Sequence, residues 1–175
     1  TITARDSADN IAAGFTGTTG FTYTVTDGLG GFDSGTVTFN VGNSAPVAGN
    51  DSYSVHAGTP LVVTSPGVLG NDSDADVDAL FVSVLDASGL DGSLTLSADG
   101  SFSFAPTAGF SGTTGFTYTV ADGFGGSDVG TVTINVTNTA PVADNETLYM
   151  WANGSLDIAG PGVLTGDIDA DGDAL

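Results

Sequence analysis

The sequence contains no cysteine and no lysine, and it has only one arginine and one histidine. The missing cysteines exclude a disulfide scaffold and a metal site built on thiolates. The sequence has 21 acidic side chains and one arginine, so its formal net charge is −20 with the histidine neutral. A charge of this size repels nucleic-acid phosphates and attracts divalent cations. We therefore expect no nucleic-acid partner.

Long apolar runs are also missing. No stretch is long enough to cross a bilayer, so we expect no membrane insertion. The chain does not begin with methionine and shows no signal peptide, which suggests an internal part of a longer protein.

What is present favours a folded all-β protein. Hydrophobic residues make up 40% of the chain, with ten phenylalanines and four tyrosines, so a disordered chain is a poor interpretation. Glu146 is the single glutamate, and every other acidic residue is aspartate. Aspartate disfavours helices, favours turns and binds hard cations.

The dominant feature is an internal repeat of 95 residues. Residues 14–80 align without a gap on 109–175, with 41 identities in 67 positions. The linkers NSAPVA and NTAPVA match, as do the two PGVL segments and the runs DSDADVDAL (72–80) and DIDADGDAL (167–175). A repeat of this length is a domain in itself. We expect residues 1–43 to be the C-terminal half of one repeat, 44–138 a complete repeat, and 139–175 the N-terminal part of a third.

Short alternating runs separated by turn residues predict a β-sandwich of seven strands in the complete repeat. In FTYTV, Phe116, Tyr118 and Val120 face one way, and Asp99-Gly100 is a hairpin turn. The same alternation points His56 and its counterpart Trp151 outward. The expected strands lie near 52–56, 60–64, 79–87, 92–97, 101–105, 115–121 and 129–136.

Asp72, Asp74, Asp76 and Asp78 occupy every second position of one segment. In an extended strand such neighbours are about 6.5–7 Å apart, too far to share one ion at roughly 2.4 Å. A curled loop would bring them together, and bound Ca²⁺ would offset their repulsion. An EF-hand loop is excluded, because Val77 replaces its glycine and Ser83 its glutamate. The remaining alternative is a solvated acidic loop.

The segments APVA…ND, VLGNDSDADVDAL and FTYTVADGFGG together resemble bacterial cadherin-like repeats of giant surface adhesins, including the tandem-95 and VCBS-like repeats. The resemblance covers all but about residues 1–13, and it implies tandem cadherin-like or immunoglobulin-like sandwiches with calcium at their junctions. Two departures are visible: the linkers lack an acidic run, and D-V-D replaces the usual D-G-D at 76–78.

The resemblance also implies a ligand set. Asp74 and Asp76 match the D-A-D segment, Asp122 the x-D-x turn, and Asn43 lies in the preceding linker. Alone, Asp122-Gly123 reads equally well as a plain turn. The whole candidate set for calcium is Asp72, Asp74, Asp76, Asp78, Asp122, Asn43, Asp27, Asp167, Asp169, Asp171 and Asp173, with Asp51 and Asp128 as second candidates.

Catalysis is not expected, because cysteine and lysine are missing and the single histidine lies outside the repeated motifs. Short Ala-Pro linkers between repeats predict an extended stalk whose partners are the neighbouring repeats. The resemblance implies that this stalk is secreted to a bacterial cell surface. Two alternatives stay open: a carbohydrate- or protein-binding module, and a subunit of an extracellular filament joined to other copies by strand complementation.

Overall fold

The computed structural model describes residues 15–175, so the predictions for residues 1–14 lie outside the described part. Within that part the chain forms nine strands and two short 3₁₀ helices. They are β1 (Gly17–Thr26), β2 (Phe32–Val41), β3 (Asp51–His56), β4 (Leu61–Val63), η1 (Gly67–Leu69), β5 (Phe81–Asp86), β6 (Gly92–Leu96), β7 (Phe102–Pro106), β8 (Gly112–Ala121), β9 (Ser127–Thr137) and η2 (Gly162–Leu164).

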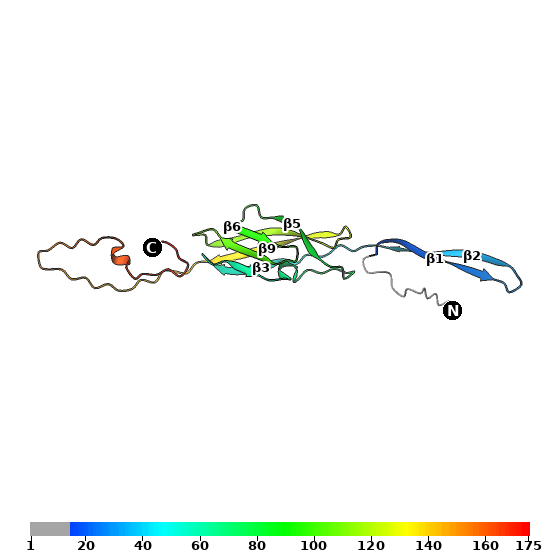
Figure 1. The fold of residues 1–175 in the computed structure, drawn as a ribbon, viewed down its shortest axis with the longest axis horizontal. Helices are drawn as coiled ribbons and strands as arrows, with labels where there is room; N and C mark the ends of the chain where they lie inside the picture. Colours follow the sequence, from blue (N-terminus) through cyan, green and yellow to red (C-terminus); the bar gives the residue numbers. More distant parts are fainter. Residues whose placement is uncertain (1–14) are drawn as a thin grey trace.

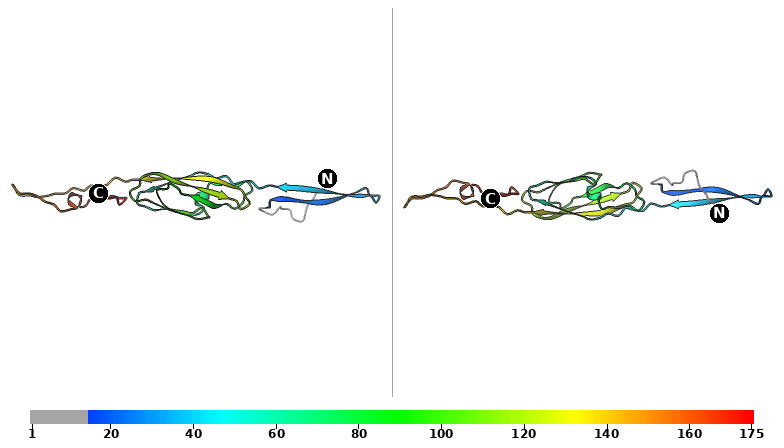
Figure 2. Two further views of the ribbon diagram at one scale, coloured as in Figure 1. Left: turned by 90° about the horizontal axis from the view of Figure 1, so that it is seen from above. Right: turned by 90° about the horizontal axis from the view of Figure 1, so that it is seen from below.

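The described residues form three parts that follow one another along the long axis of the molecule (Figure 1). A hairpin of β1 and β2 comes first, a two-layered body of β3 to β9 lies in the middle, and an open segment with η2 comes last. Two further views show the same elongated arrangement (Figure 2).

The middle body is a sandwich of two sheets, which confirms the predicted fold class. One sheet has the order β3-β9-β8-β5 and the other the order β4-β7-β6. Only the pairing of β3 with β9 is parallel among these neighbours. The chain changes sheets between β3 and β4, as strands of immunoglobulin-like sandwiches do.

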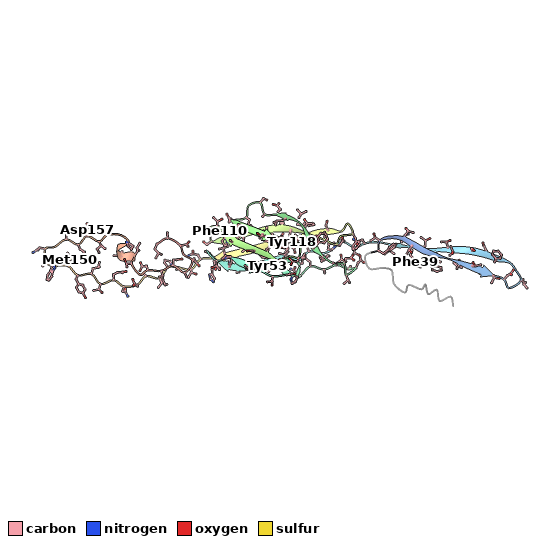
Figure 3. The ribbon with its side chains drawn as sticks, in the orientation of Figure 1. Phe39, Tyr53, Phe110, Tyr118, Met150 and Asp157 are labelled. Atoms are coloured by element: carbon pink, nitrogen blue, oxygen red, sulfur yellow. The ribbon has the colours of Figure 1, made fainter. Side chains whose placement is uncertain are left out.

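Alternation along β8 and β9 builds the core between the sheets. Phe116, Tyr118 and Val120 are buried along β8, as their period of two predicts. Val132, Ile134 and Val136 are buried along β9, and Phe102 and Phe104 of β7 close the core from the other sheet. Tyr53 and Phe102 meet edge to face with ring centroids 5.1 Å apart, a favourable geometry. Figure 3 shows Tyr53, Phe110 and Tyr118 inside this body.

The seven strands of the complete repeat occupy the predicted places, with ends shifted by a few residues. β5 is shorter than predicted, and β8 and β9 extend further, because they pair with each other over ten positions from Gly112↔Val136 to Ala121↔Ser127. The predicted Asp99-Gly100 turn joins β6 and β7, with Gly100 at φ +81°. His56 is exposed in β3, as the alternation predicted, whereas Trp151 is 90% exposed in a segment that forms no strand.

The β1–β2 hairpin and residues 139–175 repeat the sequence pattern of the middle body, but no second sheet packs against them among the described residues. β1 and β2 pair in the register of β8 and β9, yet Tyr23 is 42% exposed where its counterpart Tyr118 is 1% exposed. In residues 139–175 the structure has no strand, although the bridge Val142↔Ile168 repeats the bridge Val47↔Ser73. Both PGVL segments form 3₁₀ turns, η1 and η2, which the strand pattern did not reveal.

Candidate metal centre

Three of the four alternating aspartates come together in a curled loop. One carboxylate oxygen from each of Asp74, Asp76 and Asp78 lies within 4.8 Å of the others. The Asp74 carboxylate shapes the loop, because its Oδ1 accepts hydrogen bonds from the backbone N–H of Asp76 (2.8 Å) and of Asp78 (3.4 Å). The loop thus has the curled form that a shared cation requires.

The second oxygen of Asp74 shows that this cluster fits a cation. Asp74 Oδ2 is buried and has no hydrogen-bond partner among the described residues. A buried carboxylate oxygen without a partner is costly, whereas a hard cation such as Ca²⁺ satisfies it directly. Loss of hydration raises the pKa of Asp78, and repulsion from Asp74, Asp76 and Asp122 raises it further. The loop therefore concentrates negative charge that a divalent ion would offset.

Asp122 joins this end of the sandwich from the loop between β8 and β9. Its side chain is buried, with 3% exposed, and its Oδ1 accepts from the backbone N–H of Phe124 (2.7 Å) and Gly126 (3.0 Å). The amide of Asn43 donates to Asp122 Oδ2 at 2.7 Å. This hydrogen bond, with the two backbone ones, holds the pKa of Asp122 below its usual range, so it remains a carboxylate.

The linker that enters the repeat binds the same cluster. The backbone N–H of Ser44 donates to Asp76 Oδ2 at 2.6 Å. The end of the repeat that faces β1 and β2 therefore collects acidic side chains from two loops, and residues 43–44 of the linker hold both loops (Figure 1).

The arrangement recurs after the complete repeat. Asp169, Asp171 and Asp173 form a second group within 4.8 Å, and Asp169 Oδ1 accepts from the N–H of Asp171 (2.8 Å) and Asp173 (3.3 Å). The backbone N–H of Thr139 donates to Asp171, as Ser44 does to Asp76. The same local structure thus forms twice from the same sequence pattern.

Asp72 does not belong to the curled loop. It lies beneath Tyr118, whose hydroxyl is 3.0 Å from Asp72 Oδ1 and 3.5 Å from Asp51 Oδ2. Burial and repulsion from Asp72 raise the pKa of Asp51 to about 6. The counterparts of Gly49, Asp51 and Asp72 in the last segment, Asp144, Glu146 and Asp167, form a third acidic group within 4.8 Å.

The remaining candidates hold the backbone in place. Asp128 accepts from the N–H of Ala48 (2.9 Å) and of Val129 (2.9 Å), which lowers its pKa. Asp27 closes the loop between β1 and β2 by accepting from Leu29 (2.7 Å) and Gly31 (3.0 Å), and this loop lies at the far end of the hairpin from the complete repeat (Figure 1).

One residue of the loop was not predicted to be unusual. Val77 has φ +64°, in the left-handed region that branched side chains avoid. Its counterpart Gly172 has φ +77°, and both residues donate a 3.3 Å backbone hydrogen bond to the carbonyl three positions earlier. The D-V-D departure from D-G-D could have signalled this strain, because the loop has the geometry of a glycine position.

Comparison with known families gives two matches. The model of the bacterial cadherin-like domain matches residues 43–138, and the model of the bacterial Ig domain matches residues 2–40. Domains of these kinds are typical of extracellular surface proteins, where they typically serve as non-enzymatic structural modules. None of the described helices is long and apolar enough to cross a membrane.

Solved structures with partial similarity come from several proteins. They include a nucleoside hydrolase-related hypothetical protein from Saccharophagus degradans (20% identity, TM-score 0.39, covering 54% of this chain and 26% of that one). An endo-fucoidan hydrolase of glycoside hydrolase family 107 is also similar, with 22% identity and a TM-score of 0.38, over 73% of this chain and 20% of that one. The protocadherin GammaB4 extracellular domain has 19% identity and a TM-score of 0.37, over 67% of this chain and 22% of that one. The chain thus spans about a quarter or less of these proteins. No curated protein matches.

Proposed function

Since the chain belongs to the bacterial cadherin-like domain family, we propose that it is a calcium-stabilised repeat in the extended stalk of a secreted bacterial surface adhesin, with a role in attachment and biofilm formation. The observation that carries the proposal is Asp74 Oδ2, which is buried without a hydrogen-bond partner among residues 15–175 and lies inside a cluster of three carboxylates. The three-carboxylate cluster recurs at Asp169, Asp171 and Asp173, which supports one binding loop per repeat.

The residues that would hold the ion are Asp74, Asp76 and Asp78, with Asp122 beside them. Calcium would supply positive charge that offsets their repulsion. Because Ser44 and Asn43 of the linker bind Asp76 and Asp122, ordering this cluster also orders the connection to the preceding repeat. Calcium would therefore stiffen the stalk rather than activate chemistry.

Calorimetric titration of the whole chain with Ca²⁺ tests this function. We expect at least two binding events, and we expect Asp74→Asn to remove one of them while leaving the other. Asp91→Asn is the matched control, since it removes one exposed carboxylate just before β6 that is not part of an acidic cluster among the described residues. Equal binding by all three chains would contradict the assignment, as would equal loss in both variants.

A second candidate, assembly of copies by strand complementation, is favoured by the hairpin of β1 and β2. Tyr23, Val25 and Phe39 are exposed at positions whose counterparts Tyr118, Val120 and Ile134 are buried under an opposing sheet. Another copy could cover this face. Light scattering over a range of concentrations tests it: a constant monomer mass would exclude this candidate.

A further inference from the structure

The turn between β3 and β4 lies at the opposite end of the complete repeat from the Asp74 cluster. Ala57 is buried, and its N–H donates to the carbonyl of Thr137, where β9 ends and the second linker begins (2.9 Å). Thr59 donates to the carbonyl of His56 at 3.1 Å, which closes the turn around Gly58 at φ +69°. The turn is therefore attached to the start of the linker.

Gly58 contacts the aspartate loop of the following repeat. A Cβ atom added to Gly58 would overlap the main-chain carbonyl oxygen of Asp171, and the three nearest heavy atoms all belong to the Asp171 backbone. Asp171 is also held by the linker residue Thr139 through its N–H. In Figure 1 the C-terminal end of the chain turns back toward the complete repeat.

The equivalent turn in the last segment shows which property of glycine matters at position 58: the left-handed backbone conformation or the lack of a side chain. Asn153 occupies the equivalent position with φ +61°, and Gly154 donates to the carbonyl of Trp151 at 3.0 Å, so the same turn forms. Asparagine tolerates the left-handed region, and the turn itself does not require glycine. What glycine alone provides at position 58 is the close approach of the Asp171 carbonyl.

We propose that the Gly58 turn is a docking surface for the aspartate loop of the following repeat. The contact joins two backbones and uses none of the carboxylate oxygens of Asp171, so it forms with or without calcium. This contact goes beyond the proposed function, because the residue at position 58 would determine how two consecutive repeats are oriented. A repeat with Asn153 in its turn would present a different surface to its successor.

The unmodified chain offers a direct first test. In the presence of EDTA, nuclear Overhauser effects are expected between the Gly58 α-protons and the α-proton of Asp171, because the Asp171 Cα lies 3.9 Å from the position of an added Gly58 Cβ. Their absence in the assigned spectrum would overturn the proposal. This result is independent of calcium binding, so it separates failure of the docking surface from failure of the calcium assignment.

A variant then tests whether the contact orients the repeats. The chain has no cysteine, so spin labels at Ser93→Cys and Thr165→Cys report one distance distribution between the sandwich and the last segment. Gly58→Asn preserves the turn but fills the contact, and we expect the distribution to shift or broaden. Gly109→Asn is the matched control, since Gly109 has φ +72° and no atom within 4 Å of an added Cβ. An unchanged distribution in Gly58→Asn, or equal changes in both variants, would overturn the proposal.

Discussion

At the scale of single residues, the aspartates divide by what their oxygens contact. Asp122 and Asp128 have pKa values below the usual range because backbone and amide hydrogen bonds stabilise their charged forms. Asp78 has a raised pKa because it loses hydration and because its neighbours are other carboxylates. The first kind of carboxylate holds loops together without help, whereas the second gains from a bound cation.

The backbone conformation of Val77 leads to a prediction about stability. The left-handed conformation costs a residue with a β-carbon roughly 1–2 kcal/mol, more than glycine loses in entropy. We expect Val77→Gly to raise the free energy of unfolding of the complete repeat by about 1 kcal/mol, measured by urea denaturation in EDTA. Val77 is 88% exposed, so little buried contact is lost. Destabilisation by this substitution would show that the loop does not adopt the φ of +64°.

At the scale of elements, the strands could be predicted and the acidic clusters only in part. Strict alternation in FTYTV and TVTINV decided which residues of β8 and β9 are buried, because one face of each strand packs on the core. The separation of Asp72 from Asp74 could not be read from spacing. It depends on Tyr118, which is distant in sequence and brings its hydroxyl to the carbonyl of Val68 (2.8 Å) and to Asp72.

The flanking parts show the limit of local sequence. Residues 146–151 are the counterpart of β3, but β3 is held by its parallel pairing with β9 from Asp51↔Val132 to His56↔Thr137. No counterpart of β9 lies beside them among the described residues, and no strand forms there. The strand pattern alone does not form a β-strand, because a partner strand must supply the hydrogen bonds.

The cluster of Asp51, Asp72 and Tyr118 connects β3, β8 and the turn after η1, and it predicts a pH dependence. The folded-state pKa of Asp51, about 6, lies above its ordinary 3.8. Protonation therefore stabilises the fold: this contribution is complete below about pH 4 and is lost as the pH rises through 6. We expect Asp51→Asn to abolish this contribution, which amounts to about 1–2 kcal/mol of the free energy of unfolding between pH 4 and 8. The value is smaller than the full pKa shift would give, because solvent reaches the group and screens its charge.

The comparison that isolates this effect is the difference in unfolding free energy between Asp51→Asn and the unmodified chain, measured in EDTA from pH 4 to 8. Other carboxylates, such as Asp99 and Asp128, have lowered pKa values that act in the opposite direction, but they are common to both chains. A difference that does not vary with pH would contradict the raised pKa of Asp51.

At the scale of the whole molecule, a net charge of −20 is distributed along an elongated chain of domains. Mutual repulsion of these charges favours extension and opposes compact folding, so divalent cations should act as structural components of the proposed stalk. The linkers reinforce this arrangement, because residues 43–44 and Thr139 bind the aspartate loops directly. Each junction thus combines a short linker, an acidic loop and, after the complete repeat, the contact at Gly58.

The measurement that tests the central claim most directly is the thermal unfolding midpoint of the complete repeat within the whole chain, followed by near-ultraviolet circular dichroism across a calcium titration. Free calcium at 100 times the Kd would stabilise the fold by about 2.7 kcal/mol, and each kcal/mol raises the midpoint of a domain this size by roughly 4–8 °C. We predict a rise on the order of 10 °C, reversed by EDTA, smaller with magnesium and lost in Asp74→Asn. A midpoint that does not change with calcium would contradict the account and leave the aspartates as a solvated acidic surface.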